Sequence, residues 1–417
     1  MNVLFVVPYV PTQIRSRSYN LIRYLAGRGN RVTLVTLWTD DQEKQELGEI
    51  QQVCQDVCAL PMPAWRSLWN CLVALPTNRP LQTAYSWNPE LADQAGKLAV
   101  DGNGQGKFDV IHVEHLRGVR YGLYLRSQLA DHSRKLPIVW DSVDSISLLF
   151  RQAMVESKSF FSRSLTRFEL GRTERYESWL VNRFDALLVT SPNDQKALID
   201  MVPADEQATG VTVLRNGVDL GYFRPNNEVH REPASVVISG KMSYHANVTM
   251  ALNFVQQIMP LVWHQRPEIK VYVVGKDPAP QVQALGADLR VEVTGTVSDI
   301  RPYLWKASLA AAPVAYGAGI QNKVLEAMAC GTPVIASSQA VSALAVVPGQ
   351  DVWVADNPAE FAGALLKLLN NASLCTDLSL AGRSYVEKNH DWDRVAAQLE
   401  KIYEQAMKTR QGAEIVT

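Results

Sequence analysis

The chain has 417 residues, of which 47% are hydrophobic and 20% charged, with a formal net charge of −1. This length favours two domains over one, and the near-neutral charge excludes the strong basic excess of nucleic-acid-binding proteins. No apolar run reaches the roughly 18 residues that would predict a transmembrane helix. The five cysteines are few and odd in number, which fits a reducing compartment without a disulfide framework.

The apolar residues among 1–8 indicate a buried strand. They do not indicate a secretion signal, because the basic leader and the cleavage site of such a signal are missing. We therefore expect a cytoplasmic protein. Short apolar strands then alternate with helices, the first at Arg17–Arg28, which predicts a parallel sheet covered on both faces. The strands are expected at Val3–Val7, Val32–Leu37, Phe108–His115, Leu136–Asp141 and Phe184–Ser191.

A long basic helix is expected at Arg151–Arg183, where aromatic residues interleave with charges. Two interpretations stay open. The helix can be an ordinary solvated face, or it can dock on an anionic bilayer or a lipid-linked acceptor by partial insertion of its aromatic side chains. In the second case the protein would be peripheral on the cytoplasmic membrane face.

The pattern changes near Val211–Pro225, and the polar, turn-rich stretch Arg224–Pro233 predicts an interdomain linker. We expect one α/β domain of residues 1–220, completed by 391–417, and a second of residues 221–390. Ligands of such domains bind at the carboxyl ends of strands, so the site should lie on loops that follow strands. The elements expected in the second series are strands at Ser235–Gly240, Lys270–Gly275, Arg290–Thr294, Leu309–Pro313, Pro333–Ala336 and Asp351–Val354, then a last helix at Trp392–Thr409.

The most informative motif spans residues 319–335. A tight polar loop leads to a short helix that carries Lys323 and Glu326, and Gly331 ends that helix before the next buried strand. Such a loop points backbone N–H groups and the positive end of a helix dipole at one place, which suits a diphosphate. Lys323 adds a positive charge, and Glu326, on the same helix face, offers acceptors for hydroxyls.

Two other nucleotide-binding motifs are missing. Binding of a nicotinamide or flavin dinucleotide requires Gly-x-Gly-x-x-Gly after the first strand, where residues 8–17 contain no glycine. No Walker loop occurs in the sequence either. The sequence therefore disfavours a dehydrogenase or a P-loop kinase.

The motifs, taken in order, resemble those of the GT-B glycosyltransferases, close to family 4. The resemblance covers nearly the whole chain and implies two Rossmann-like, doubly wound domains that face each other across a cleft. The form of Gly319–Lys323 resembles a subgroup of bacterial exopolysaccharide and cell-surface sugar transferases. The matching segments are the first strand with the Arg17–Leu34 unit, Val213–Pro225, Ser239–Lys241, Val274–Gly275, Thr294–Val297, residues 319–335 and His390–Trp392 with the last helix.

This resemblance implies transfer of a sugar from a nucleotide-diphosphate sugar to a hydroxyl acceptor, with retention of configuration, in polysaccharide or glycolipid assembly. It implies no cofactor and no required metal, and a front-face route in which the departing diphosphate helps to deprotonate the incoming hydroxyl. Two lysines would stabilise that diphosphate, and Glu326 would bind the ribose. The implied donor-binding residues are Gly240, Lys241, Thr296, Val297, Gly319, Ile320, Gln321, Asn322, Lys323 and Glu326.

Two departures from the family pattern matter. The family carries Glu-x7-Glu, and Glu326 fits the second position while Ala318 stands at the first. The backbone amides of residues 319–321, or the glutamine side chain among them, would have to replace the missing carboxylate. The family's glycine pair after the first strand is replaced by Arg15 and Arg17, which we assign to the acceptor side.

Further candidates end two strands of the first domain. The family often has a histidine that approaches the donor sugar here, and the register leaves open whether it is His112 or His115, which strand alternation places on opposite pleat sides. A satisfied core histidine is the alternative for His112. His115, Glu114 and Asp141 are the catalytic candidates. Asp144 can orient an acceptor hydroxyl or cap the following helix.

Other functions fit the same resemblance. The chain can glycosylate a small natural product, or it can be a sugar-nucleotide epimerase or hydrolase. It can also be a catalytically weak subunit that binds glycan, which the alanine at the first glutamate position keeps open. The sequence does not identify the base, the sugar or the acceptor, because base contacts in this fold depend mainly on backbone and shape.

Overall fold

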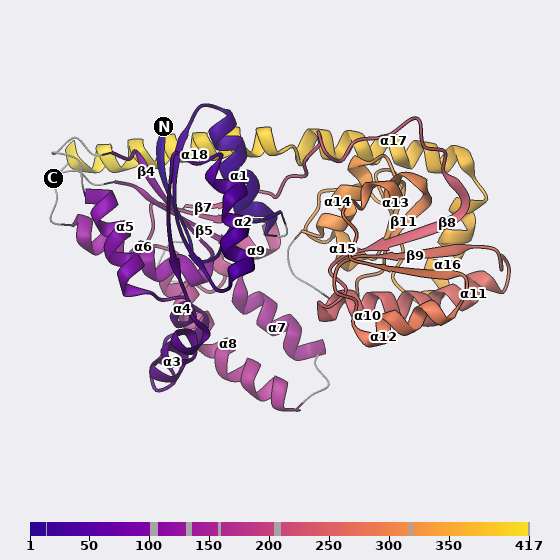
Figure 1. Cartoon of the computed structure of the whole chain (residues 1–417), viewed down its shortest axis with the longest axis horizontal. Helices are drawn as coiled ribbons and strands as arrows, with labels where there is room; N and C mark the ends of the chain where they lie inside the picture. Colours follow the sequence, from indigo (N-terminus) through magenta and orange to yellow (C-terminus); the bar gives the residue numbers. More distant parts are fainter. Residues whose placement is uncertain are drawn as a thin grey trace. The chain divides into compact units, whose positions relative to one another are not determined.

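The computed structural model describes residues 1–13, 15–100, 107–130, 136–156, 160–203, 210–316 and 320–415, with side chains except within 155–165 and 411–415. The chain forms two compact units, Met1–Asn216 with Trp392–Thr417, and Gly217–Asp391. Each unit is built around one parallel sheet (Figure 1). In the described part of the chain, no helix is both long and apolar enough to cross a bilayer.

The predicted α/β architecture is confirmed in the first unit. Its described residues form a seven-stranded parallel sheet in the order β3-β2-β1-β4-β5-β6-β7. The sequence pattern misses β3, because this edge strand is only half-buried and shows no strong apolar run. The strands are β1 Asn2–Val7, β2 Arg31–Trp38, β3 Asp56–Pro61, β4 Val110–Glu114, β5 Ile138–Val143, β6 Ala186–Val189 and β7 Val211–Val213.

Helices connect these parallel strands and cover both faces of the sheet, as crossover connections require. Alternation along β1 divides the core, since Leu4 and Val6 pack on the side of α5 and α6, whereas Phe5 packs on the side of α1 and α18. The helices of this unit are α1 Ser16–Gly27, α2 Asp41–Gln51, α3 Ala64–Ala74, α4 Leu81–Tyr85, α5 Pro89–Val100, α6 His115–Leu129, α7 Ile146–Glu156, α8 Phe160–Leu180, α9 Pro192–Ile199 and α18 Trp392–Ile415.

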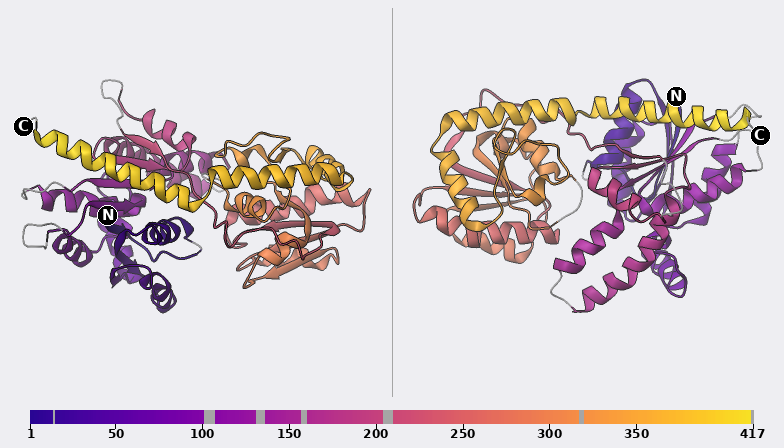
Figure 2. Two further views of the ribbon diagram at one scale, coloured as in Figure 1. Left: turned by 90° about the horizontal axis from the view of Figure 1, so that it is seen from above. Right: turned by 180° about the vertical axis from the view of Figure 1, so that it is seen from behind.

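The last helix belongs to the core of the first unit although it ends the chain. Tyr403 and Trp392 of α18 are fully buried against this sheet, and Figure 2 shows α18 running along that face. Gln398 donates to the Val213 carbonyl at 3.4 Å, which ties α18 to the edge strand β7.

The single helix predicted at Arg151–Arg183 is wrong. The chain forms two helices, α7 and α8, which pack as a hairpin that projects from the sheet (Figure 2). Glu177 of α8 accepts the backbone N–H groups of Ile146 and Ser147 at 2.8 and 3.1 Å. A carboxylate from α8 thus caps the amino end of α7. This contact is long-range, and no local residue pattern predicts it.

The second unit repeats the architecture. Its described residues form a six-stranded parallel sheet in the order β10-β9-β8-β11-β12-β13. The strands are β8 Glu232–Ser239, β9 Lys270–Val274, β10 Val291–Gly295, β11 Ala307–Ala312, β12 Val334–Ala336 and β13 Trp353–Val354. Its helices include α10 His245–Asn253, a π-helical turn Phe254–Ile258, α11 Met259–Trp263, α12 Pro280–Gln283, a 3-10 turn Ala284–Ala287, α13 Arg301–Lys306, α14 Asn322–Ala329, α15 Ser338–Val341, α16 Pro358–Leu369 and α17 Ala372–Asn389.

Each strand order contains one switch point, from which the chain builds the sheet in opposite directions. It lies between β1 and β4 in the first unit and between β8 and β11 in the second. Doubly wound sheets bind ligands outside the carboxyl ends of their strands at this point. The loops that follow these four strands are therefore where functional side chains are sought.

Candidate functional site

Two glycines shape the carboxyl edge of the second sheet. Gly240 follows β8 and Gly275 follows β9, with φ angles of 150° and 153°. A Cβ on Gly275 would lie 1.7 Å from the Gly240 carbonyl oxygen, and one on Gly240 would lie 2.7 Å from the Asn247 side chain. Only glycine fits here, so the two loops approach each other through backbone alone. Lys241 comes directly after Gly240, and its side chain is exposed at the switch point.

The helix predicted to carry Lys323 and Glu326 is α14. Its apolar face packs into the core of the unit through Val324 and Met328. It ends at Gly331, whose φ of 69° places it in the left-handed region. The Gly331 N–H bonds the Met328 carbonyl and the next N–H reaches the Ala327 carbonyl, both at 2.9 Å, a C-terminal turn that favours glycine.

Lys323 and Glu326 form a desolvated pair in the first turns of α14. The Lys323 ammonium donates to Gln321 Oε1 at 3.0 Å. Burial lowers the pKa of Lys323 to about 8, against the opposing charge of Glu326. Burial also raises the pKa of Glu326 to about 7, against the charge of Lys323. Among the described residues no hydrogen bond reaches the Glu326 carboxylate, so the pair is suited to accept a polar ligand.

The other donor-side candidates lie at different distances from this pair. Ile320, Gln321 and Asn322 lead into α14 and are half-buried. Thr296 is exposed and Val297 half-buried after β10, an edge strand two positions from β8. Gly319 and the Ala318 position lie outside the described residues.

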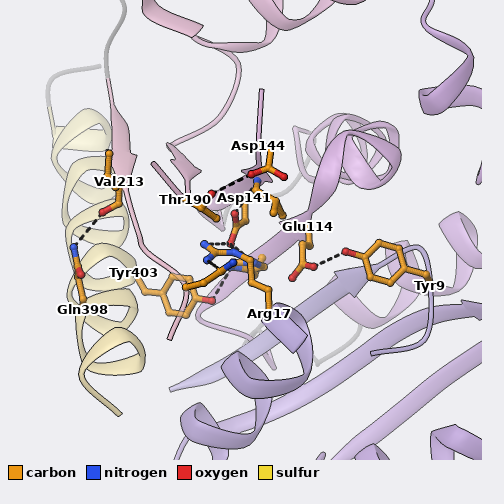
Figure 3. Close-up of polar contacts among 12 residues, drawn as sticks. Tyr9, Arg17, Glu114, Asp141, Asp144, Thr190, Val213, Gln398 and Tyr403 are labelled. Carbon is orange, nitrogen blue, oxygen red and sulfur yellow. Dashed lines mark hydrogen bonds and ion pairs between the residues drawn. The ribbon is translucent and has the colours of Figure 1, made fainter. Parts of the chain in front are cut away.

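In the first unit, Arg17 and Asp141 form a buried ion pair (Figure 3). Arg17 lies in the first turn of α1 and is 5% exposed. Its Nη2 lies 2.7 Å and its Nε 2.9 Å from Asp141 Oδ2, and its Nη1 donates to Asn216 Oδ1 at 2.6 Å. An acceptor-side candidate and a catalytic candidate therefore neutralise each other.

A second contact joins the two sides of the switch point in this sheet. The Tyr9 hydroxyl, just after β1, donates to Glu114 Oε1 at the end of β4 at 2.5 Å (Figure 3). Burial, and then the negative charge of Asp141, raise the pKa of Glu114, while Tyr9 and Arg17 oppose the shift. Burial raises the pKa of Asp141 as well, and Arg17 opposes it. The Arg17 guanidinium thus contacts the Asp141 carboxyl group and also stabilises the charged form of Glu114 electrostatically.

His112 is a fully buried core histidine with one of its two ring nitrogens hydrogen-bonded in the part of the chain that the structure describes. Its ring stacks on Phe5 with centroids 4.1 Å apart. Its Nδ1 bonds the Tyr403 hydroxyl at 2.9 Å (Figure 3), and its Nε2 lies 3.8 Å from Asp141 Oδ2. Burial, reinforced by Arg17, lowers the pKa of His112 well below its usual value. The ring is therefore neutral, and its Nε2 has no hydrogen-bond partner among the described residues.

His115 has a strained backbone. Its φ is 65°, and it begins α6 directly after β4. Its Nδ1 accepts the Arg117 N–H at 3.2 Å, and burial lowers its pKa to about 3. Val143 at the end of β5 and Asp277 after β9 share the left-handed region, with φ of 69° and 53°. Such strain concentrates at functional sites, and here it occurs at the carboxyl ends of strands.

Asp144 does not cap α7, whose amino end is held by Glu177 instead. The Asp144 carboxylate accepts the Thr190 hydroxyl at 3.1 Å (Figure 3). Burial, and then the charge of Asp194, raise the pKa of Asp144 to about 6. Of the two alternatives for Asp144, capping is wrong and the orienting role stays a prediction.

Arg15 lies apart from the Arg17–Asp141 pair. Its guanidinium pairs with Glu43 of α2 at 2.7 Å, and it lies 5.2 Å from the centre of the Tyr9 ring. Arg15 is partly exposed, with 41% of its side chain accessible. It is therefore the more accessible of the two arginines assigned to the acceptor side.

Three of these residues have the spacing of metal ligands. His112, Glu114 and Asp141 offer ligand atoms that lie within 4.8 Å of one another. The Arg17 guanidinium, however, contacts Asp141 Oδ2 at 2.7 Å, and Tyr403 bonds one nitrogen of His112. The residues fit an arginine-neutralised pair of carboxyl groups better than a cation site.

Sequence reasoning missed the partners that complete this cluster, namely Tyr9, Asn216 and Tyr403. Tyr9 follows β1 at the switch point, so the topology could have indicated it. Asn216 lies 199 positions from Arg17, and Tyr403 lies 291 positions from His112. Asn216 lies in the matching segment Val213–Pro225, but no local signal marks it as a partner of Arg17 or marks Tyr403 as a partner of His112.

Family models match both parts of the chain. Glycosyltransferase Family 4 matches residues 16–222, and Glycosyl transferases group 1 matches residues 233–371. The first match falls in the unit with Arg17 and Asp141, and the second contains Lys241, Lys323 and Glu326. Both therefore include the carboxyl edges described above.

Individual relatives are distant. The D-inositol 3-phosphate glycosyltransferase of a Nocardioides species is 24% identical over 259 residues, 55% of this chain and 56% of the relative. The lipopolysaccharide core biosynthesis mannosyltransferase LpcC of Rhizobium leguminosarum bv. viciae is 24% identical over 252 residues, 56% of this chain and 68% of the relative. The chain spans little more than half the length of the first of these.

Among solved structures, Anabaena Alr3699/HepE in complex with UDP and glucose superposes with a TM-score of 0.65 and 15% identity. The match covers 96% of this chain and 98% of that one. At this identity the likeness concerns the fold, and it confirms the predicted GT-B architecture.

Proposed function

The chain belongs to the glycosyltransferases, with a family 4 domain followed by a group 1 domain, and we propose that it moves a sugar from a nucleotide-diphosphate sugar to a hydroxyl acceptor with retention of configuration. The observation that carries the proposal is the half-buried, partly desolvated pair of Lys323 and Glu326 at the start of α14. A desolvated ammonium beside a desolvated carboxyl group suits a ligand that presents both phosphate oxygens and sugar hydroxyls.

Each group has a separate role in this proposal. Lys323, with Lys241 from the loop after β8, neutralises the charge that develops on the leaving diphosphate. Glu326 accepts hydrogen bonds from the ribose hydroxyls. Gln321 bonds the Lys323 ammonium at 3.0 Å and so holds it in place before the donor arrives. Neither lysine needs a metal ion to do this, so the reaction is proposed to be metal-independent.

The first unit supplies groups for the acceptor and the donor sugar. Asp141 is paired with Arg17 and Glu114 with Tyr9, so neither stands as a ready nucleophile. This supports a front-face route, in which the leaving diphosphate takes the acceptor proton. His115 is proposed to contact the donor sugar and Asp144 to orient the acceptor hydroxyl. The acceptor is proposed to belong to polysaccharide or glycolipid assembly, in keeping with the name of the LpcC relative.

Donor binding is the direct test. We expect UDP, GDP or another nucleoside diphosphate to raise the melting temperature of the chain, since a ligand at a hundredfold excess over its Kd stabilises by about 2.7 kcal/mol. Lys323→Ala and Glu326→Ala should each abolish this shift and lower kcat/KM by about 10²–10³-fold. Lys270→Ala is a matched control, because Lys270 is exposed at the opposite end of the same sheet.

Three outcomes would refute parts of the proposal. A chain that binds no nucleoside diphosphate is a scaffold or a glycan-binding subunit. A chain that converts the donor sugar without an acceptor is an epimerase or hydrolase. Turnover that disappears with EDTA and returns with a divalent cation would refute metal independence.

A further inference from the structure

Helix α3 exposes its apolar face to solvent. Trp65, Leu68, Trp69, Leu72 and Val73 are between 56% and 66% accessible. Their spacing, i, i+3, i+4, i+7, i+8, is that of the stripe by which a helix normally packs against a core. Here the stripe faces outward over the whole length of Ala64–Ala74.

The helix is nevertheless firmly held. Its buried side is small, with Ser67 at 2% and Ala74 at 7% exposure. Asn70 donates to the Trp87 carbonyl at 2.8 Å, and Arg172 of α8 donates to the Ala74 carbonyl at 2.6 Å. The exposed stripe is therefore presented by a fixed element, which Figure 1 shows beside α4 and α8.

The exposed face continues onto neighbouring elements. Leu75 after α3 is 44% exposed and Tyr85 of α4 is 40% exposed. Phe168 of α8 is 47% exposed, beside Arg172, whose guanidinium lies 4.8 Å from its ring. The α3 surface, defined as the five stripe residues with Leu75, Tyr85 and Phe168, is a much larger apolar patch than the scattered exposed side chains normal for a soluble face.

The segment of the chain that contains α3 carries cations and no carboxylates. Residues 57–89 contain no Asp or Glu but include Arg66 and Arg79. Arg117 and Arg120 of α6 lie over Tyr85 and Trp87, at 5.3 and 3.9 Å from the ring centres.

These arginines lack partners of opposite charge. No ion pair is formed by Arg66, Arg79, Arg117 or Arg120 within the part of the chain that the structure describes. Burial, and then the charge of Arg79, lower the pKa of Arg120, which shows that the two cations lie close enough to repel each other. The Glu169 carboxylate, which reaches this region, is held by Arg172 at 3.0 Å and by the Leu81 N–H at 2.8 Å.

We propose that the α3 surface docks on an anionic lipid bilayer. The helix would lie in the plane of the interface, with two tryptophans at headgroup level and the leucines below. The unpaired arginines would meet lipid phosphates. A folded protein partner of matching shape would need acidic side chains around an apolar groove, whereas a bilayer supplies anionic and apolar layers in the order that the helix presents them.

The position of α3 relative to the first sheet suggests a function for membrane docking. α3 follows β3, whose parallel alignment with β2 places its carboxyl end at the same edge of the sheet as Glu114 and Asp141. A bilayer at α3 would thus face the edge where the first unit is proposed to receive its acceptor. This last point rests on the proposed function and favours an acceptor that resides in the membrane, but the docking itself does not depend on it.

The α3 surface differs in position from the segment Arg151–Arg183, for which membrane docking stays a prediction. The segment Arg151–Arg183 uses much of its charge internally, since Glu174 pairs with Arg151 at 2.7 Å and Glu177 caps α7. That segment contributes Phe168 to the α3 surface, whose apolar stripe lies on α3 and is flanked by cations without ion pairs among the described residues.

Vesicle flotation of the full chain tests the proposal. The chain should float with vesicles of phosphatidylcholine and phosphatidylglycerol, and markedly less with phosphatidylcholine alone. The double variant Trp65→Ser/Trp69→Ser should weaken binding about tenfold or more. Arg66→Gln and Arg79→Gln should each weaken binding to anionic vesicles by about fivefold.

Matched controls lie in the Gly217–Asp391 unit, where Leu289 and Leu380 are 101% and 67% exposed. Leu289→Ser/Leu380→Ser should float as the unaltered chain does. Stabilisation by nucleoside diphosphates should be the same in all variants, so a failed donor site and a failed docking surface give different results.

The proposal is overturned if the unaltered chain does not float with anionic vesicles, or if the tryptophan variant floats equally well. It is also overturned if the chain forms a dimer that Trp65→Ser/Trp69→Ser dissociates while vesicles are not bound. In that case the α3 surface is an interface between two copies.

Discussion

The two units are both doubly wound parallel sheets, but the polar groups at their switch points differ in how far they are paired with each other. In the first unit these groups satisfy one another, through Arg17 with Asp141 and Tyr9 with Glu114. In the second unit, Lys323 and Glu326 are desolvated, and their charged forms are disfavoured. The first edge is a pre-formed network of side-chain contacts, whereas the second holds two groups whose charged forms are disfavoured by burial.

Removing one cation from each edge should give opposite results for stability. Arg17→Ala leaves Asp141 and Glu114 buried without a counter-charge, so it should lower the stability of the first unit by about 3–5 kcal/mol. Lys323→Met replaces a desolvated ammonium by an apolar side chain of similar length, so it should leave stability unchanged or higher. Urea-dependent amide exchange, followed separately in each unit, measures both effects.

The contrast between the two edges is refuted if Arg17→Ala and Lys323→Met change stability by the same amount. Equal losses would mean that Lys323 is a structural cation, and its place in the donor site would be in doubt. A silent Arg17→Ala would mean that Asp141 is solvated in solution. Lys196→Ala controls for loss of an exposed pair, because Lys196 and Asp200 are 74% and 57% exposed and should contribute less than about 1 kcal/mol.

The closed network also predicts a pH effect on the first unit. The folded-state pKa of Glu114 is raised above the usual 4.5, so the folded state binds its proton more tightly than the unfolded state does. Stability from this group is fully present below pH 4.5 and is lost as the pH rises through the raised pKa. Glu114→Gln keeps an acceptor for Tyr9 and removes the titration.

We expect Glu114→Gln to be more stable than the unaltered chain at pH 8, by at least the roughly 1.4 kcal/mol that one pKa unit represents. The advantage should shrink towards pH 5. Chemical unfolding at several pH values checks this. A constant difference between the two proteins at all pH values would mean that Glu114 is ionised throughout.

The open pair predicts a pH optimum for donor binding. The ammonium of Lys323 is protonated below about pH 8, and the carboxyl group of Glu326 is ionised above about pH 7. Affinity for a nucleoside diphosphate should therefore be highest between these values and fall about tenfold per pH unit above 8. Isothermal titration calorimetry measures the profile.

Single variants assign the two limbs of that profile. Lys323→Gln should flatten the alkaline limb and Glu326→Gln the acidic limb, each at lower overall affinity. Lys270→Gln, at the opposite end of the sheet, should change neither. An alkaline limb that survives in Lys323→Gln would transfer the titration to another group.

Some parts of both units could be predicted from the sequence, and others could not. The two parallel sheets and the helix carrying Lys323 and Glu326 follow from apolar periodicity and from Gly331 as a stop signal, all of them local. The lone helix expected at Arg151–Arg183 was wrong because the chain forms two helices, α7 and α8, that pack against each other, a tertiary arrangement that no short window contains. The Arg17–Asp141 pair could not be predicted either, since 124 positions separate its members.

Residues that face solvent were equally hard to interpret. The stripe of α3 has the spacing of a core-facing helix, and only the structure shows that this face is exposed. Hydrophobic periodicity indicates that one side of a helix is apolar, but it does not predict whether that side packs against the protein or faces solvent.

The smallest predicted effect comes from the two buried tyrosine–histidine pairs, one in each unit. Tyr403→Phe removes the hydroxyl that bonds His112 Nδ1 at 2.9 Å and should cost about 1 kcal/mol of stability. Tyr385 bonds His390 at 3.1 Å and also accepts the Ala345 N–H at 3.0 Å, so Tyr385→Phe should cost more. The effects on kcat/KM should have the reverse order, because His112 stands 3.8 Å from the catalytic candidate Asp141, whereas His390 precedes α18 in the chain. A larger loss of activity in Tyr385→Phe would show that stability alone governs turnover, and that the network around Asp141 does not position it for the reaction.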